Sequence, residues 1–262
     1  MRHFVAKGPA RLSQVAGTST CSNERGRHHD CDTVVENRID MAYAKLHVLS
    51  RITESGLVAI VRTDNSNQAS RIVEACVEGG AAAIEITFTV PRATAIIEEL
   101  AKRYPAKELA LGAGTVLDPE TARIAILAGA QFVVSPSLNT GTARLCNRYQ
   151  IPYLPGAGTI GEIVEALECG VDIVKVFPGE TLGPAFVKAA RAPLPHASLM
   201  PTGGVTIDNA AEWIAAGSIA LGVGGSLTAG AKTGDFRAVT DLTRRFIAVI
   251  REARGSRSGQ KQ

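Results

Sequence analysis

The sequence has few aromatic residues, little net charge and no long apolar run. Phe, Trp and Tyr make up 5% of the 262 residues, and the formal net charge is +3. A charge this small gives no reason to expect a nucleic-acid partner. No apolar stretch approaches the roughly 20 residues that are needed to span a bilayer, so we expect no membrane partner. These absences leave a soluble globular protein, in which 45% hydrophobic residues can form a sizeable core.

Cysteine is scarce as well, and its pattern points to one compartment. The five cysteines are odd in number and include no C-x-x-C pair; they are Cys21, Cys31, Cys76, Cys146 and Cys169. This usage favours reduced thiols in a cytoplasmic protein.

Residues 1–40 differ in composition from the rest of the chain. They are rich in Ser, Thr, Arg, His and Asn and lack sustained periodicity, which predicts a disordered extension. The apolar pattern of a secretory signal is absent, whereas an organellar transit peptide stays open. Cys21, His28, His29 and Cys31 cluster here, but their spacing matches no standard zinc motif, so we interpret them as part of a solvated tail.

From Met41 onward, short apolar segments alternate with helical patterns. We hypothesise that the fold and the natural translation start both begin at Met41; an intact mass that includes residues 1–40 would reject the second part. A leading helix at about 41–55 is followed by eight predicted strands. The strands are Leu57–Arg62, Ala82–Thr87, Glu108–Leu111, Gln131–Val134, Pro152–Leu154, a segment within Val171–Glu180, Ser198–Pro201 and Ile219–Val223. Helices are predicted at about 66–79, from Pro91 on, and at 118–129, 139–149, 159–169, 185–191, 207–216 and 235–254.

This alternation predicts an α/β protein with a (β/α)8 barrel. About eight strand–helix units fit in roughly 210 residues, which is the usual size of that fold. A doubly wound sheet is the rival, but no G-x-G-x-x-G follows the first strand. We expect one barrel domain at 41–254, with a polar, basic tail at 255–262.

Lys175 lies in the middle of an apolar, β-branched stretch, V-D-I-V-K-V-F-P-G-E. On a strand, Ile173, Lys175 and Phe177 share one face, and Val174 and Val176 share the other. A buried lysine is paired, reaches solvent with its tip, or is held neutral. A neutral amine is a nucleophile suited to Schiff-base chemistry with carbonyl substrates. A strand-end lysine that simply reaches water is the competing interpretation.

The ends of the other strands carry residues suited to the same chemistry, because the active site of a barrel lies at the carboxyl ends of its strands. Glu85 reaches the interior near Lys175 if Ile84 and Ile86 face the helices. The pair is then either a base beside a nucleophile or a structural ion pair. Arg62 ends the first strand, where a guanidinium could bind a carboxylate or simply lie at the surface.

Glycine pairs follow the last two predicted strands, in T-G-G at 202–204 and G-G-S at 224–226. In barrels these two loops commonly hold a phosphate, which approaches bare backbone N–H groups. A single pair could be a turn, but two pairs on consecutive loops favour a phosphate site.

At these residues the sequence resembles the 2-keto-3-deoxy-6-phosphogluconate / 4-hydroxy-2-oxoglutarate aldolases. The matching segments occur in order over about residues 45–250. They are A-I-V-R at 59–62, E-I-T-F-T-V-P at 85–91, G-A-G-T-V-L at 112–117, F-V-V-S-P at 132–136, P-G at 155–156, V-K-V-F-P-G-E at 174–180, P-T-G-G-V at 201–205 and G-V-G-G-S at 222–226. The resemblance implies a trimeric (β/α)8 barrel and class I aldolase chemistry.

The resemblance also assigns roles residue by residue. The Schiff-base lysine of the family falls on Lys175 and its acid/base glutamate on Glu85. Other matched positions bind substrate: Arg62 the pyruvate carboxylate, Thr115, Pro136 and Phe177 the keto-acid pocket, and Gly203, Gly204, Gly224, Gly225 and Ser226 the phosphate. We add Thr202 and Thr89 to the substrate-binding set. Thr89 stands where some members carry an arginine, and Ser137 where a glycine is common.

The activity implied by the resemblance is cleavage of 2-keto-3-deoxy-6-phosphogluconate to pyruvate and glyceraldehyde 3-phosphate, in the Entner–Doudoroff pathway. We expect no metal and no cofactor. Cleavage of 4-hydroxy-2-oxoglutarate or of the 6-phosphogalactonate epimer stays open, because a sequence does not reveal the configuration of one hydroxyl. Two rivals lie outside the aldolases: a barrel isomerase or synthase, such as a thiamin-phosphate synthase-like protein, and a non-catalytic phosphosugar-binding barrel.

Overall fold

The computed structural model describes residues 44–258, with side chains up to residue 256. The expectations for residues 1–40, for Met41, for the Cys21–Cys31 cluster and for the last residues of the tail lie outside the described residues. Within them, no helix is long and apolar enough to cross a membrane.

The structure is α/β, and every strand pairing in it is parallel. The strands are β1 (Leu57–Val61), β2 (Ala83–Thr87), β3 (Ala110–Gly114), β4 (Phe132–Val134), β5 (Tyr153–Leu154), β6 (Gly156–Ala157), β7 (Val174–Val176), β8 (Leu199–Pro201) and β9 (Leu221–Val223). They form a six-stranded sheet in the order β5-β4-β3-β2-β1-β9 and a three-stranded sheet in the order β6-β7-β8. A bridge between Thr202 and Gly222 links β8 to β9.

The fifth predicted strand, Pro152–Leu154, corresponds to β5, and a further short strand, β6, follows it that the sequence does not predict. β5 pairs with β4, whereas β6, only one residue further on, pairs with β7. Pro155 stands between them, and its carbonyl accepts a hydrogen bond from the Lys175 backbone N–H at 2.9 Å. Because a proline has no N–H, it interrupts a ladder at its own position. The chain therefore changes partner strand at Pro155.

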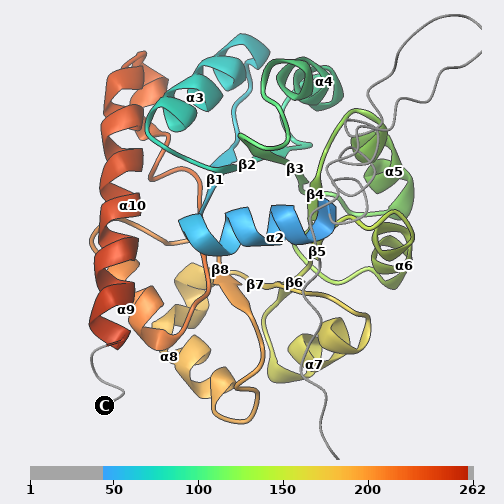
Figure 1. Cartoon of the computed structure of the whole chain (residues 1–262), viewed down its shortest axis with the longest axis vertical. Helices are drawn as coiled ribbons and strands as arrows, with labels where there is room; N and C mark the ends of the chain where they lie inside the picture. The colour runs from blue at the N-terminus through green and yellow to red at the C-terminus, as the bar shows by residue number, and fades with distance from the viewer. Residues whose placement is uncertain (1–43, 259–262) are drawn as a thin grey trace, which may run out of the picture. The chain divides into compact units, whose positions relative to one another are not determined.

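The helices lie around the strands (Figure 1). They are α2 (Ala44–Ser55), α3 (Ser66–Glu78), α4 (Ala93–Arg103), α5 (Pro119–Leu127), α6 (Thr140–Arg148), α7 (Ile160–Glu168), α8 (Gly179–Arg191), α9 (Ala210–Ala216), the 3-10 helix η1 (Ala229–Thr233) and α10 (Phe236–Ser258). Local caps explain several starts: Asn65, Asp118, Asn139 and Thr159 each accept a backbone N–H from the first turn of the helix that follows.

Helix α2 covers the amino ends of the strands, across the centre of Figure 1. Its Val48 and Ile52 are buried and belong to a core cluster with side chains from the strands. That cluster includes Val58, Ala83, Ala110, Phe132, Leu154, Ile173, Met200 and Ala220. A second core cluster lies between the strands and the outer helices. Since α2 closes one end of the strands, ligand access is from their carboxyl ends.

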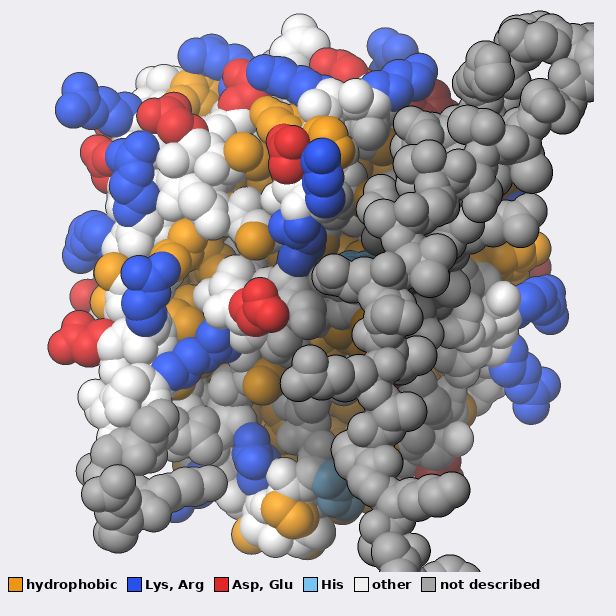
Figure 2. Space-filling model, viewed as in Figure 1, with side chains coloured by type: hydrophobic (Ala, Val, Ile, Leu, Met, Phe, Trp, Pro, Cys, Tyr) orange, Lys and Arg blue, Asp and Glu red, His pale blue; other side chains and the backbone are white. Residues whose placement is uncertain are grey.

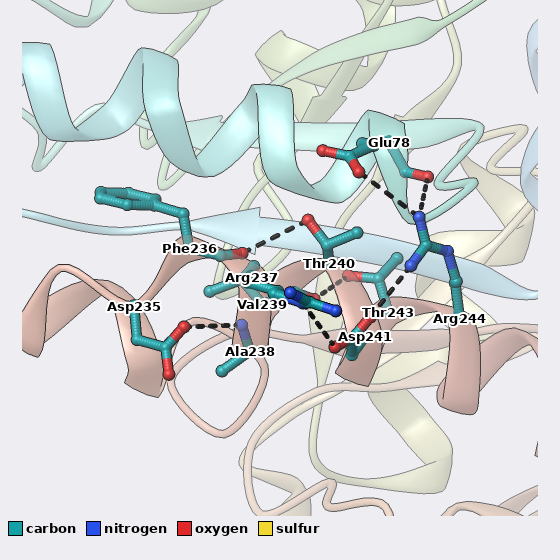
Figure 3. Close-up of polar contacts among 10 residues, drawn as sticks. All are labelled: Glu78, Asp235, Phe236, Arg237, Ala238, Val239, Thr240, Asp241, Thr243 and Arg244. Atoms are coloured by element: carbon teal, nitrogen blue, oxygen red, sulfur yellow. Dashed lines mark hydrogen bonds and ion pairs between the residues drawn. The ribbon is translucent and has the colours of Figure 1, made fainter.

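Helices α3 and α10 contact each other at two places, of which Figure 3 shows the contact between Glu78 and Arg244. Arg244 of α10 donates to the Glu78 carbonyl at 3.3 Å and to Asp241 at 2.9 Å. Arg71 of α3 stacks over the ring of Phe236, with 3.9 Å from its guanidinium carbon to the ring centroid. Figure 2 shows basic and acidic side chains interspersed along this edge.

The structure extends one predicted strand and adds one helical segment that the sequence does not predict. The sequence predicts a third strand that ends at Leu111, but β3 continues to Gly114. Its glycines are strand residues whose missing side chains make room for neighbours inside the sheet. The helix predicted at 185–191 agrees with the second of two helical segments within Gly179–Arg191, which are separated at Gly183, where φ is 69°. The first segment, which begins at Gly179, is not predicted by the sequence.

Candidate active site

In the strands that carry Lys175 and Glu85, the side chains that face the helices are those that the sequence predicts. Ile84, Ile86, Val174 and Val176 pack in the core between strands and helices. Lys175 and Glu85 therefore point to the opposite, inner side, because side chains alternate along a strand. Both side chains line one cavity of about 620 Å³ at the carboxyl ends of the strands.

Most of the predicted site residues line this same cavity. They are Arg62, Glu85, Thr115, Pro136, Lys175, Phe177, Thr202, Gly203, Gly204, Gly224, Gly225 and Ser226. They come from strand ends that are widely separated in the sequence. The volume is in the range of small-molecule sites.

Lys175 is a buried amine without a fixed partner. Its residue is 6% exposed, and its Nζ makes no hydrogen bond or ion pair within the described residues. The Nζ lies 4.9 Å from the centroid of the Phe177 ring. Burial lowers the pKa of Lys175, and the nearby Arg62 lowers it further, while Glu85 opposes the shift. The surroundings therefore favour the neutral, nucleophilic form of the amine.

Glu85 is even more enclosed, at 1% exposed, and its Oε2 has no hydrogen-bond partner among the described residues. Burial raises the pKa of Glu85, against the opposing charges of Lys175 and Arg62. The two shifts bring the pKa values of the carboxyl and the amine closer together, which favours proton exchange between them. A lone, partnerless carboxylate oxygen facing a cavity is also ready to accept a hydrogen bond from a ligand or water.

Gly114 creates the space that the Glu85 carboxylate occupies. The two residues are near neighbours on paired strands β2 and β3, and a Cβ added at Gly114 would overlap Oε1 of Glu85. Gly112, two residues earlier on the same face, leaves room in the same way for the Phe132 ring. These glycines therefore set the position of the carboxylate and of the layer beneath it.

Thr115 and Pro136, which both line the cavity, are held by their local structure. Thr115 has a φ of 58°, a conformation that costs energy for a β-branched residue and that is found most often at functional sites. The loop with Pro136 is held by the Tyr153 hydroxyl, which lies 2.6 Å from Ser135 Oγ and accepts the Asn139 N–H at 3.2 Å. Tyr153 therefore fixes the wall to which Pro136 belongs.

The loops after β8 and β9 present free backbone donors to the cavity. Within the described residues, the N–H groups of Gly203, Gly204, Gly225 and Ser226 donate no hydrogen bond. Gly203 and Gly204 have φ values of 91° and 67°, a region that favours glycine. A Cβ added at Gly225 would meet no protein atom within 4 Å among those described. This open, donor-lined space suits an anion such as phosphate.

Two hydroxyls of this region differ in what they can offer. The buried Oγ1 of Thr202 has no partner among the described residues, so it is available to a ligand. The Ser226 hydroxyl instead donates to the Val205 carbonyl at 2.6 Å. Ser226 thus ties the β8 loop to the β9 loop, and its side chain can only accept from a ligand while this bond is intact.

Thr89 is the one predicted site residue that the structure does not bring to the cavity. Its side chain is exposed, does not line the cavity, and pairs with Thr87 Oγ1 at 2.8 Å. Sequence reasoning also missed several lining residues, namely Ile60, Glu180, Val205, Thr206, Gly222, Thr228 and Lys232. The alternation of side chains along the first strand predicts that Ile60 faces the interior, so this residue could have been found. Lys232 lies on η1, a short 3-10 helix that no pattern in the sequence predicts.

The site contains no group of metal ligands. Among residues 44–258, no three His, Cys, Asp or Glu side chains gather closely enough to hold a metal ion. The chemistry that the described side chains offer is instead nucleophilic and acid–base, from an amine, a carboxyl and a fixed guanidinium.

Known proteins are similar to this chain in sequence and in architecture. A sequence profile described as "Aldolase: KDPG and KHG aldolase" matches residues 48–242. A 2-dehydro-3-deoxy-phosphogluconate aldolase of Treponema pallidum is 37% identical over 199 residues, covering 74% of this chain and 93% of the relative. A 2-dehydro-3-deoxy-6-phosphogalactonate aldolase of Escherichia coli is 35% identical over 176 residues, covering 67% and 85%.

A solved structure is similar as well. It is described as KDPG aldolase from Legionella pneumophila with pyruvate captured at low pH as a covalent carbinolamine intermediate. The TM-score is 0.69 at 25% identity, with 77% of this chain and 96% of that chain covered. The profile match over most of the chain, together with relatives above 30% identity, shows the family. The chain belongs to the KDPG and KHG aldolase family and is a carbon–carbon lyase of the aldolase type.

Proposed function

We propose that the protein is a class I aldolase that cleaves 2-keto-3-deoxy-6-phosphogluconate to pyruvate and glyceraldehyde 3-phosphate through a Schiff base on Lys175. The observation that carries the proposal is the buried, unpaired amine of lowered pKa beside a buried carboxyl of raised pKa. The pyruvate carbinolamine described for the Legionella relative supports the same chemistry. The relatives named as phosphogluconate aldolases support this substrate.

The first half of the reaction makes the electron sink. The neutral Nζ of Lys175 attacks the C2 ketone, and the resulting carbinolamine loses water to give an iminium. Glu85 supplies the proton that leaves with the C2 oxygen as water, directly or through a water molecule. Its raised pKa favours the protonated form that can supply this proton. Arg62 binds the C1 carboxylate and so holds C2 against the amine.

The second half breaks the C3–C4 bond. Glu85, now a carboxylate, accepts the C4 hydroxyl proton, directly or through water. The C3–C4 electron pair moves into the iminium to form an enamine, and glyceraldehyde 3-phosphate leaves. Glu85 then returns the proton to C3, and water adds to the iminium. As pyruvate and the neutral amine are released, the proton that this hydrolysis sets free returns to the Glu85 carboxylate. The carboxyl ends in the protonation state in which it began.

Two further substrates have support in the family. The Escherichia coli relative at 35% identity is named for the 6-phosphogalactonate acid, which differs at C4. The family description also includes 4-hydroxy-2-oxoglutarate, the KHG of its name. We propose the phosphogluconate acid as the main substrate, and a panel of all three acids with the same enzyme preparation ranks them.

We also propose that the two sheets form one closed (β/α)8 barrel. The pairings run around the strands from β5 to β6 through β9 and β8, and only Pro155 separates β5 from β6. The protein is proposed to be cytoplasmic, where its free Cys76, Cys146 and Cys169 stay reduced. The homotrimer implied by the resemblance is supported by exposed apolar side chains near α5, at Leu117, Ile124 and Leu127.

The variant Lys175→Met tests the function, because methionine keeps the length of the side chain but removes the nucleophile. Turnover should fall by at least about 10⁴-fold, while glyceraldehyde 3-phosphate should still bind. The coupled assay is pyruvate release followed by lactate dehydrogenase. Turnover within tenfold of wild type would exclude a Schiff base on Lys175 and leave a non-aldolase barrel. Circular dichroism and thermal unfolding show whether the variant is folded.

A further inference from the structure

We propose that Lys232 binds the anionic group at the far end of the substrate and thereby selects phosphorylated over unphosphorylated 2-keto-3-deoxy acids. Lys232 lies on η1, six residues after Ser226, and it lines the cavity. The inference rests on the proposed function, because it assumes that the substrate carries a negative group at each end. It adds a specificity-determining residue that sequence reasoning did not identify.

The charges that line the cavity leave one cation for that role. The lining includes three basic residues and two acidic ones: Arg62, Lys175, Lys232, Glu85 and Glu180. Lys175 is the nucleophile, and the charge of Arg62 acts directly on both Lys175 and Glu85. Arg62 is therefore placed for the carboxylate next to C2. Lys232 is the remaining cation in the lining, and within the described residues it makes no ion pair or hydrogen bond.

The backbone loops alone are poorly supplied with positive charge. Gly203, Gly204 and Gly225 offer N–H dipoles, but the Ser226 hydroxyl is already used to bond the Val205 carbonyl. Glu180 brings a carboxylate to the same loops, since its side chain lies where a Cβ on Gly203 would be. A phosphate dianion placed there is repelled by that carboxylate. A nearby cation is needed to offset this repulsion.

The position of η1 is fixed by hydrogen bonds to the neighbouring unit. Gln68 of α3 donates from Nε2 to the Ala231 carbonyl at 2.7 Å, and its Oε1 accepts the Thr63 hydroxyl. Thr63 directly follows Arg62. These two bonds connect the segment after β1 to η1, and so hold the turn that carries Lys232 in place. Lys232 itself stays exposed and able to reach the ligand.

The test compares Lys232→Ala and Lys232→Arg with Lys188→Ala, a matched exposed lysine on α8 that does not line the cavity. In Lys232→Ala, we expect kcat/KM for the phosphorylated acid to fall about fivefold, the upper end of what one exposed charge contact contributes. For unphosphorylated 2-keto-3-deoxygluconate it should stay within about twofold. Lys232→Arg should keep most of the preference, and Lys188→Ala all of it.

A binding measurement separates this inference from the aldolase function. Isothermal titration of the full chain with sn-glycerol 3-phosphate should give an affinity about fivefold weaker in Lys232→Ala, and unchanged in Lys188→Ala. If both substrates lose activity equally, or if the glycerol phosphate binds Lys232→Ala as it binds wild type, the inference is overturned. The wild type could fail to cleave any keto acid and still bind glycerol phosphate more tightly than Lys232→Ala does. In that case the aldolase function fails and the role of Lys232 in binding the anion stands.

Discussion

Single residues set the protonation of the catalytic pair, and the direction of each effect can be tested. Burial lowers the pKa of Lys175, whereas the Glu85 carboxylate pulls it upward. Glu85→Gln removes that opposing charge but keeps the size of the side chain. The pKa of Lys175 should then fall further, so the neutral amine should persist to lower pH.

The expected result for Glu85→Gln is a double effect. Turnover should drop by about 10²–10⁴-fold, because the proton shuttle is lost. The acid limb of the pH profile for borohydride trapping of pyruvate should move to lower pH, since protonation of the amine ends trapping. A limb that moves to higher pH would contradict the assignment of the two pKa shifts. Asp64→Asn, at an exposed position outside the cavity lining, is the control.

A second prediction at this scale uses two glycines on one face of β3. A Cβ at Gly114 would overlap the Glu85 carboxylate, so Gly114→Ala should displace it and lower kcat by about 100-fold. A Cβ at Gly112 would instead overlap the Phe132 ring. Gly112→Ala should therefore cost about 1–3 kcal/mol in the free energy of unfolding and keep kcat within threefold. Equal kcat losses in both variants would show that Gly114 has no special role.

Much of the site could be predicted at the level of residues, and the exceptions have a common cause. Lys175 and Glu85 stand out because a charge in an apolar strand is rare, and alternation then gives the face on which they lie. Thr89, Lys232 and Glu180 lie on segments outside the strands, where no period fixes the direction of a side chain. Their placement depends on hydrogen bonds between loops, such as Gln68 to Ala231, which the sequence does not reveal.

At the scale of elements, the loop between β4 and α6 depends on one tyrosine. Tyr153→Phe removes the hydroxyl that contacts Ser135 and Asn139. We expect a loss of about 1–2 kcal/mol in the free energy of unfolding and a severalfold higher KM for the keto acid, because Pro136 is less well held. Tyr149→Phe, at the end of α6, should change neither quantity. An unchanged KM in Tyr153→Phe would contradict a positioning role for the loop.

The order and type of the elements were predictable because apolar strands and capped helices alternate along the chain. The bounds of some strands were not predictable, because they depend on contacts with residues that are distant in the sequence. The split between β5 and β6 arises at Pro155, whose carbonyl meets the Lys175 backbone. The longer β3 includes glycines that local preference assigns to a loop, whereas the Glu85 and Phe132 side chains require them in a strand.

At the scale of the whole molecule, the proposed homotrimer can be measured directly. Light scattering coupled to gel filtration should give three times the mass of one chain. Exposed apolar groups such as Leu127, which is 70% exposed, are the surface that gains most from burial. Ile124→Glu combined with Leu127→Glu should lower the mass toward one chain, and Leu46→Glu on α2 should not. A wild-type monomer at micromolar concentration would contradict the trimer.

The central claim, a Schiff base on Lys175, is tested most directly by mass spectrometry of the protein after mixing with pyruvate and sodium borohydride, with a chelator present. We predict one reduced pyruvyl group per chain, located on the peptide that contains Lys175 and absent from Lys175→Met. Folded protein that gains no adduct, or gains it on another lysine, would contradict the claim.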